Sequence, residues 1–466
     1  MESITQLFDH QKANALRVKQ SSVKERKAKL RRLRISIQKH EQEIFSALKA
    51  DLRKSEFESA VFEVNVIYAE IKFALDNLQE WMEPLRVYSN KVNMMTCNRI
   101  LYEPKGVCLI ISPWNYPFQL TLSPLVSAIA AGNCCILKPS ELSPETSKAM
   151  GKIIKSTFEE NEVALIEGDA DVATALLSKP FDHIFFTGST NIGKVVMKAA
   201  AANLSTVTLE LGGKSPVIID EHVNLKKAAE KIAWGKWANA GQTCIAPDYI
   251  FVPTKLKEEF ITLAKASIEK LYLQENKQLN KEDYGRIISP RHYNRLKELT
   301  EEALQKGGKA ELGGTFTETD LTIAPTILSG VDEDARIMKE EIFGPILPVK
   351  TYENIQEALD YINANEKPLA LYVFSSSKKT VRTILKKTSS GGVCVNDVLI
   401  HLTNPYIPFG GAGASGMGGS HGFFGFKAFS HERGIMYQNR FIDFGKIIYP
   451  PYKGKGWVMR VIRRLM

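Results

Sequence analysis

The sequence predicts an α/β fold with two mostly parallel sheets, and three observations support this. The chain has 466 residues, which is too long for one ordinary hydrophobic core. From about residue 105, short apolar runs alternate with stretches of helical periodicity. These runs are apolar throughout, which is typical of strands buried on both faces of a parallel sheet. Two α/β lobes are therefore expected.

The first ~80 residues are expected to be helical because two apolar series recur at helical spacing. Pro84 ends this region. The run from Lys24 to Lys54 is rich in cations, but no aromatic-laced basic module accompanies it. A solvated helix face is therefore favoured over nucleic-acid binding. The two series are Leu30, Leu33, Ile37, Ile44 and Leu48, then Phe57, Val61, Val64, Ile67, Ile71 and Leu75.

Extended segments follow the helices. Residues 86–104 have the pattern of a hairpin that projects from the body. The two lobes are expected to join near residue 210, and the glycine-rich segment 408–425 marks an irregular crossing before a final extended segment. Strands are expected at 107–111, 134–138, 164–168, 183–188 and 206–211, with helices at 122–132 and 191–203, and then strands at 248–253, 369–376 and 391–397.

Composition excludes several classes of protein. Hydrophobic residues make up 44% of the chain and charged residues 24%, which is typical of globular proteins. No apolar run is long enough to span a bilayer, and the first residues lack the apolar segment of a secretory signal. The six cysteines form no CxxC pair and the eight histidines no HExxH motif, so no metal site is predicted. A reducing, cytoplasmic location is expected.

The segment 183–196, HIFFTGSTNIGKVV, suggests a phosphate site. A buried strand runs into Gly188, and Ser189 can cap the helix that follows. Gly193 lacks a side chain at a point where a phosphate or another backbone could approach. Unpaired N–H groups at such a helix start favour an anion, for example a dinucleotide pyrophosphate. The spacing is GxxxxG rather than GxGxxG, so an ordinary capped turn is the alternative.

Two other strand ends carry polar side chains. Lys138 and Glu141 follow the strand at 134–138, and groups at this edge of a parallel sheet suit the hydroxyls of a ribose. A surface ion pair is the alternative. Asn115 lies between an aromatic residue and a proline beyond the strand at 107–111. Its amide could donate a hydrogen bond to an oxyanion, or the residue could simply form a turn.

Glu210 and Cys244 are the candidate reacting groups. Glu210 ends a strand with apolar neighbours, and burial would raise its pKa into the range useful to a general base. Cys244 lies in a loop beside Gln242 and Thr243, where a reactive thiol is expected. Cys134 and Cys135 lie within a strand and are expected to be inert. An inert, buried thiol is also the alternative for Cys244.

In this order, seven motifs resemble the aldehyde dehydrogenase superfamily, from about residue 10 to about residue 440. PWNYP and GQTCIAPDY are most similar to class 3, which includes fatty and aromatic aldehyde dehydrogenases. The resemblance implies two Rossmann-like domains with a small β bridging element. The motifs are PWNYP, KPSE, FTGSTNIG, LELGGKSP, GQTCIAPDY, EEIFGP and PFGGAGASGMG. The implied domains are NAD(P)-binding at 1–85 and 105–209, catalytic at 210–405, bridging and oligomerising at 86–104 and 426–446, and a tail at 447–466.

The resemblance also implies roles. Cys244 attacks the aldehyde, Asn115 and the Cys244 N–H stabilise the oxyanion, and Glu210 activates the water that hydrolyses the thioester. Glu341 is expected at the nicotinamide ribose, Lys138 and Glu141 near the adenosine ribose, and the 188–193 turn at the pyrophosphate. Phe343 and Phe409 are expected to line the nicotinamide and substrate region, with plain packing as the alternative.

Cofactor and partners follow from the same resemblance. Glu141 favours NAD because a 2′-phosphate would meet its like charge, with NADP tolerated. A homodimer is expected. Residues 453–466 carry apolar side chains on one helical face together with several cations, so contact with an anionic membrane is weighed against a packed or disordered tail. Alternatives are a CoA-acylating dehydrogenase or acyl reductase, which would not need Glu210, and a non-catalytic family member, which would not need Cys244.

Overall fold

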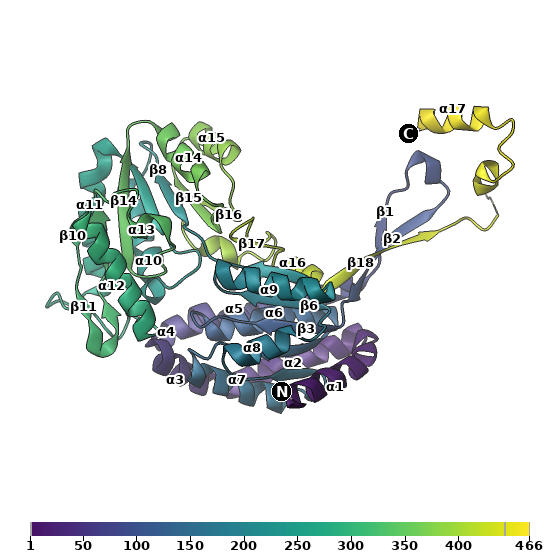
Figure 1. Cartoon of the computed structure of the whole chain (residues 1–466), viewed down its shortest axis with the longest axis horizontal. Helices are drawn as coiled ribbons and strands as arrows, with labels where there is room; N and C mark the ends of the chain where they lie inside the picture. Colours follow the sequence, from purple (N-terminus) through teal and green to yellow (C-terminus); the bar gives the residue numbers. More distant parts are fainter. Residues whose placement is uncertain (1, 442–443, 466) are drawn as a thin grey trace.

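The computed structural model describes residues 2–441 and 444–465 and contains two large sheets and a projecting arm (Figure 1). The first large sheet has six strands. All its neighbouring strands are parallel except the short β17, which comes from the glycine-rich segment and pairs antiparallel with β7. In spatial order the strands are β17 (Gly416–Met417), β7 (Thr206–Glu210), β6 (His183–Thr187), β3 (Val107–Ile111), β4 (Cys134–Lys138) and β5 (Val163–Leu165).

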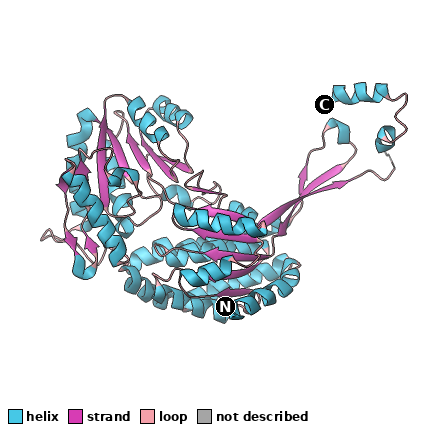
Figure 2. Ribbon diagram, viewed as in Figure 1, coloured by secondary structure: helices cyan, strands magenta, loops and turns pink. Residues whose placement is uncertain are grey.

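Helices cover both faces of this sheet (Figure 2). The first apolar series, Leu30 to Leu48, is fully buried in one core, which confirms that prediction. The helices are α1 (Glu2–Lys19), α2 (Val23–Lys39), α3 (Glu41–Leu52), α4 (Glu56–Ser59), α5 (Asn65–Met82), α6 (Pro117–Ala131), α7 (Pro144–Thr157), α8 (Ala170–Leu177) and α9 (Thr190–Asn203).

The second apolar series departs from the prediction at its first member. Phe57 is 76% exposed, whereas Val64, Ile67 and Ile71 are fully buried. A π-helical turn, η1 (Ala60–Val64), lies between them. A π turn holds more residues than an α turn, so it changes which residues share a face across the junction. The same turn places Glu63 in the interior beside Val64.

The second sheet has seven strands, all parallel except for the edge strand β10. The strands, in spatial order, are β10 (Lys309–Leu312), β13 (Thr326–Ser329), β14 (Ile346–Tyr352), β9 (Tyr249–Pro253), β8 (Pro216–Ile219), β15 (Ala370–Phe374) and β16 (Gly392–Val395). Its helices are α10 (Leu225–Trp237), α11 (Lys257–Tyr272), α12 (Pro290–Gln305), α13 (Arg336–Lys339), α14 (Ile355–Ala364) and α15 (Lys378–Lys387), and β11 (Phe316–Thr317) pairs with β12 (Thr322–Ile323) beside it.

A three-stranded antiparallel sheet forms the arm that projects from the body (Figure 1). The predicted hairpin at 86–104 is present as β1 (Leu85–Val87) and β2 (Cys97–Pro104), and β18 (Ser430–Tyr437) pairs with β2. The final extended segment begins later than expected, because Phe426 lies in helix α16 (Gly422–Ala428). There its buried ring packs against Trp81 and Tyr102.

The last helix, α17 (Gly456–Leu465), lies near the tip of the arm, close to the hairpin turn that contains η2 (Lys91–Asn93) (Figure 1). Val458 is buried, but Trp457 and Val461 of the expected apolar face are exposed. The side chain of Leu465 lies outside the described residues, as do residues 442–443 of the predicted bridging element. Among the described residues, no helix combines the length and apolar character needed to cross a bilayer.

Candidate active site

A cleft of about 630 Å³ lies between the two large sheets. Its first wall is formed by the carboxyl ends of β3, β6 and β7, where ligands of parallel sheets gather. Its second wall comes from the loop before β9, the start of α12 and residues 339–343. The cleft brings together seven of the residues that the sequence analysis selected: Asn115, Gly188, Ser189, Glu210, Cys244, Glu341 and Phe343.

Cys244 lies in the loop between α10 and β9, where the backbone is unusual. Asn239 and Ala240 have φ angles of 49° and 52°, and Gly241 has 73°. A Cβ at Gly241 would lie 2.3 Å from the carbonyl oxygen of Gly344, so only glycine fits. Burial, and then the nearby Glu341 and Glu210 carboxylates, raise the pKa of Cys244 to about 12. The free protein therefore holds Cys244 as a thiol, and a cation brought beside it would favour the thiolate.

Glu210 ends β7 and is only 6% exposed. The Ser420 hydroxyl donates a hydrogen bond of 3.0 Å to its Oε1, and its Oε2 has no protein partner. Burial raises the pKa of Glu210 to about 8, and the Ser420 hydrogen bond and the charge of His421 oppose this rise. A carboxyl group with such a pKa can take a proton from water near neutral pH.

A second, smaller cavity of about 30 Å³ lies on the other side of the reacting groups. Cys244 and Glu210 line both spaces, so each group faces the wide cleft and the small cavity. Phe409, which was expected in the substrate region, lines the small cavity together with Ser420 and His421. A space of this size, next to an unpartnered carboxylate oxygen, can hold a water molecule.

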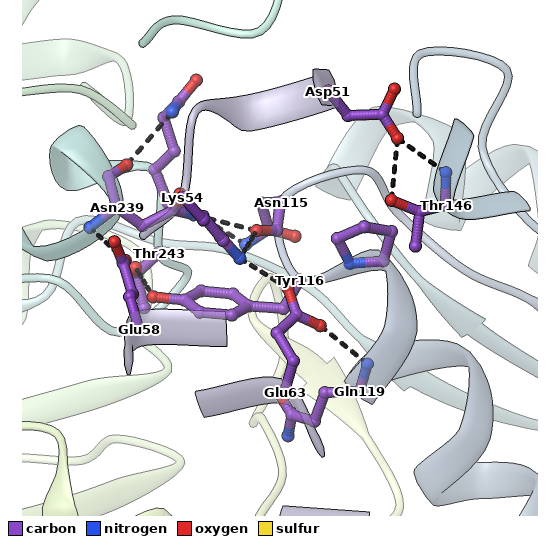
Figure 3. A network of polar contacts seen from close by, with 12 residues as sticks. Asp51, Lys54, Glu58, Glu63, Asn115, Tyr116, Gln119, Thr146, Asn239 and Thr243 are labelled. Atoms are coloured by element: carbon purple, nitrogen blue, oxygen red, sulfur yellow. Dashed lines mark hydrogen bonds and ion pairs between the residues drawn. The ribbon is translucent and has the colours of Figure 1, made fainter. Parts of the chain in front are cut away.

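Asn115 follows β3 and is held on both its main chain and its side chain (Figure 3). Its Nδ2 donates a hydrogen bond of 2.9 Å to the carbonyl of Gln242, two residues before Cys244. The carbonyl of Asn115 accepts hydrogen bonds from Lys54 Nζ at 2.8 Å and from Asn239 Nδ2 at 2.9 Å. The amide donor is thus tied directly to the loop that carries the thiol.

Lys54 is the centre of this network (Figure 3). Its fully buried ammonium donates to Glu63 Oε1 at 2.5 Å and lies 3.8 Å from the centre of the Tyr116 ring. The hydroxyl of Tyr116 is 2.9 Å from Thr243 Oγ1, which precedes the thiol. A buried ammonium needs close partners, and two of these partners, Asn115 and Tyr116, in turn contact the loop that carries the thiol.

Gly188 and Ser189 lead into α9 at the edge of the cleft. Ser189 is the N-cap of α9, as predicted, and its hydroxyl accepts from the N–H of Ile192. Gly193 differs from the expectation. It is buried, does not line the cleft, and a Cβ there would lie 2.6 Å from the side chain of Leu211. This glycine allows α9 to pack closely on Leu211.

Glu341 and Phe343 lie on the opposite wall. Burial raises the pKa of Glu341 to about 7, and the backbone N–H of Gly213 and then the Lys214 charge lower it in part. Phe343 has a φ of 49°, which is rare for a bulky residue, and its ring lies edge-on to Trp114 at 5.4 Å. Arg295 holds this segment by donating to the carbonyl of Ile342.

Lys138 and Glu141 do not line the cleft. Lys138 is buried at the end of β4, and its Nζ donates to the carbonyl of Pro139 at 2.9 Å and to Glu141 at 3.4 Å. The Glu141 side chain is half exposed. The ion pair that was the alternative to ribose binding is therefore present at the sheet edge, outside the residues that line the cleft.

Three groups of residues at or around the site were not predicted from the sequence. Arg291, His292 and Arg295 line the cleft from the start of α12, and their spacing on one helix was the only signal. Glu70, Ser420 and His421 meet behind Glu210, but Glu70 precedes His421 by 351 residues in sequence, so no local pattern could join them. The third group is the buried pair of Lys54, which was assigned to a solvated helix face, and Glu63, which was not singled out.

A half-buried thiol, an amide donor and a buried carboxyl group at the edge of a nucleotide-binding type of sheet define an oxidoreductase that works through a covalent thiol intermediate. The chain belongs to the aldehyde dehydrogenase family, whose model matches residues 2–435.

Named relatives support this assignment. The chain is 43% identical to 4,4'-diaponeurosporen-aldehyde dehydrogenase of Staphylococcus aureus, covering 98% of each chain. It is 46% identical to aldehyde dehydrogenase family 3 member A2 of Mus musculus, over 91% of this chain and 86% of that protein. The substrate-bound structure of Staphylococcus aureus AldH matches with a TM-score of 0.93 and 42% identity, covering 98% and 99% of the two chains. The resemblance to class 3 and the predicted fold class are thereby confirmed, and the protein oxidises aldehydes.

The Lys54 network generates a prediction. Lys54→Met should lower kcat about tenfold to a hundredfold with little change in KM, because Asn115 and the thiol loop lose their common anchor. It should also lower the free energy of unfolding by about 3–5 kcal/mol, because Glu63 is left buried without its cation. Steady-state kinetics and chemical denaturation measure the two effects.

The double variant Lys54→Met/Glu63→Gln is the matched control, because it removes both charges. It should recover much of the stability but not the turnover. A folded Lys54→Met protein with wild-type kcat would contradict the anchoring role.

Proposed function

We propose that this enzyme oxidises medium-chain and long-chain aliphatic aldehydes to carboxylic acids through a thioester on Cys244. The observation that carries this proposal is the convergence of Cys244, Asn115 and Glu210 at the junction of the wide cleft and the small cavity. One side of the thiol can then receive a dinucleotide, while the other receives the aldehyde and the water.

The steps use groups that face one another. Cys244 first loses its thiol proton to water, and the thiolate sulfur then adds to the aldehyde carbon, while the amide of Asn115 and the Cys244 N–H donate to the oxygen that becomes negative. When bound, NAD supplies the acceptor for the hydride that leaves this carbon. Glu210 then takes a proton from water as the water oxygen attacks the thioester. The C–S bond breaks, and the acid and the Cys244 thiolate are released.

The wide cleft suits a dinucleotide. The start of α9 offers N–H groups, and Arg291, Arg295 and Lys339 place three cations in the same cleft, as a pyrophosphate requires. Glu341 can accept hydrogen bonds from the hydroxyls of the nicotinamide ribose. NAD is preferred over NADP if the adenosine ribose extends past the cleft to the end of β4, where the half-exposed Glu141 would repel a 2′-phosphate. The NAD(P)-binding domain is assigned to 1–85 and 105–209, and the catalytic domain to 210–405.

The aliphatic chain of the substrate fits a third space. A cavity of about 190 Å³ adjoins the small cavity at His421. Most of its lining is apolar, which favours a hydrocarbon chain over a polar substrate. The apolar lining residues are Val61, Val66, Ala69, Phe73, Leu402 and Pro405.

The arm and the tail have separate roles in this proposal. The strands at 86–104 and within 426–446 expose backbone edges and side chains far from the body, as expected of an element that pairs two subunits in a homodimer. Residues 453–466 would contact an anionic membrane. Trp457, Met459 and Val461 are exposed beside basic residues on one short helix.

Aldehyde oxidation can be tested directly on the purified protein. NADH formation without CoA should rise in kcat/KM from short to long straight-chain aldehydes, because each buried methylene contributes up to about 0.8 kcal/mol. The same series with NADP should give lower kcat/KM values. A preference for benzaldehyde or the shortest chains would contradict the assignment of the apolar cavity, and NADH formation only with CoA would contradict hydrolysis.

Glu210→Gln separates the two halves of the reaction. We expect a burst of NADH equivalent to the active sites, followed by turnover about 10²- to 10⁴-fold slower, because the amide cannot accept the proton from water. Stopped-flow absorbance measures both phases. Cys244→Ala, the control, should lose the burst as well. Wild-type steady-state turnover in Glu210→Gln would overturn the role of this carboxylate.

Membrane contact can be tested with vesicles. The full chain should co-sediment with phosphatidylglycerol vesicles at low salt and be released as salt is raised, because the cations of the tail contribute about 1 kcal/mol each near an anionic surface. Neutral phosphatidylcholine vesicles and the variant Trp457→Ser/Val461→Ser should bind far less. Equal binding by the variant would refute the assignment of this surface to the tail.

A further inference from the structure

His421 lies where two cavities meet behind the reacting groups. It lines the small cavity together with Cys244 and Glu210, and it lines the apolar cavity together with Glu70. The side chain is 7% exposed. This buried, titratable side chain takes no part in the steps proposed for the reaction, although it lines the same small cavity as Glu210.

Glu70 holds His421 from behind. Glu70 Oε1 is 2.7 Å from His421 Nδ1, and its Oε2 accepts a hydrogen bond of 3.3 Å from the N–H of Gly422. His421 has a φ of 68°, a left-handed conformation that non-glycine residues rarely adopt. One carboxylate from α5 therefore fixes both the imidazole and the strained backbone that presents it.

This contact also favours the charged imidazole. Burial opposes the charged form of His421, but the Glu70 carboxylate and then Glu210 outweigh it, so the pKa of His421 is raised above its ordinary value. The charge of His421 acts in the opposite direction on Glu210, because it lowers the pKa of that carboxyl group. Burial raises the pKa of Glu210, while Ser420 and the His421 charge lower it. Each group thus favours the ionised form of the other.

The neighbouring residue binds the same carboxyl group. Ser420 donates to Glu210 Oε1, and Glu210 Oε2 is buried without a protein partner beside a space that can hold one water molecule. A water there can reach Glu210, Cys244 and His421, the three titratable groups that line the small cavity. Glu70 is the charged group behind them, on α5.

We propose that His421, held by Glu70, is a positioning residue whose charge favours the carboxylate form of Glu210, the form needed to hydrolyse the thioester. This inference rests on the proposed function. During hydrolysis, the proton of the attacking water passes to Glu210 while the C–S bond breaks and Cys244 leaves as thiolate. The imidazolium of His421 keeps its proton throughout and acts only through its charge and its place beside the base.

The test measures how fast the acyl-enzyme decays as a function of pH. The probe is the octanoyl adduct on Cys244, formed from 4-nitrophenyl octanoate, quenched at intervals and followed by mass spectrometry over about pH 6 to 9. His421→Asn removes the charge and keeps a residue that tolerates positive φ, and Glu70→Gln removes the charge that holds the imidazole. In both variants, the rise of the decay rate with pH should move up by about one pH unit.

Below the pH at which the decay rate rises, the acyl-enzyme of each variant should decay about tenfold more slowly than that of the wild type. At high pH, the decay rates of the variants and the wild type should converge. His401→Asn is the matched control. His401 is a partly buried histidine 6.0 Å from the Phe409 ring, and burial lowers its pKa to about 4, so it carries no charge at neutral pH. Its pH profile should coincide with that of the wild type.

Decay that is slower by the same factor at every pH, or a wild-type profile in either folded variant, would overturn the proposal. If His421→Asn does not fold, Glu70→Gln decides the question, because it leaves the strained residue itself unchanged. If the wild type forms no adduct on Cys244, the proposed function fails rather than the role of His421. NADH release from aldehyde is the independent readout for that case.

Discussion

The active site depends on the ammonium group of Lys54, which is buried without access to water. Such a charge is tolerated only with close partners, and removing one partner of a buried pair costs about 3–5 kcal/mol. The partners here are Glu63 from the π-helical turn, the carbonyl of Asn115 after β3, and the face of Tyr116. Because these partners tie the N-terminal helices, the first sheet and the thiol loop together, the distance between the amide donor and Cys244 is fixed before any substrate arrives.

Backbone strain gathers around the same site, and buried charged or polar groups hold it in place. Asn239, Phe343 and His421 all have positive φ, each costing on the order of 1 kcal/mol. Each also has a dedicated restraint. Glu58 accepts from the N–H of Asn239, Arg295 donates to the carbonyl that precedes Phe343, and Glu70 binds both His421 and the next N–H. The buried carboxylates outside the reaction thus shape the loops that carry the reacting groups.

The sequence was sufficient to predict the strands and to select residues that the structure brings together in the cleft, because both depend on local patterns. Buried strands that end in a polar residue give Asn115 and Glu210, and a thiol in a polar loop gives Cys244. The restraints around them could not be predicted in this way. Lys54 was assigned to a basic, solvated helix face, since its partners Glu63 and Asn115 approach only in the folded chain, and the π turn that directs Glu63 inward has no sequence signature. At Gly193 the turn itself was predicted, but a phosphate was expected to approach it. In the structure, the side chain of Leu211 fills the space beside this glycine.

The surroundings of the site also determine how readily Glu210 and Cys244 ionise. Burial raises the pKa of both Glu210 and Cys244, so the free site tends toward two neutral groups. The proposed mechanism uses both as anions at different moments, the Cys244 thiolate for attack and the Glu210 carboxylate for hydrolysis. An anion at one of them disfavours an anion at the other, so each requires its own source of positive charge. The wide cleft, which can admit a cationic ring, is on one side of Cys244, and the His421–Glu70 pair lies behind Glu210 on the other. In the proposed mechanism the two sources are separate, so a bound cofactor can favour the thiolate of Cys244 while the His421–Glu70 pair favours the carboxylate of Glu210.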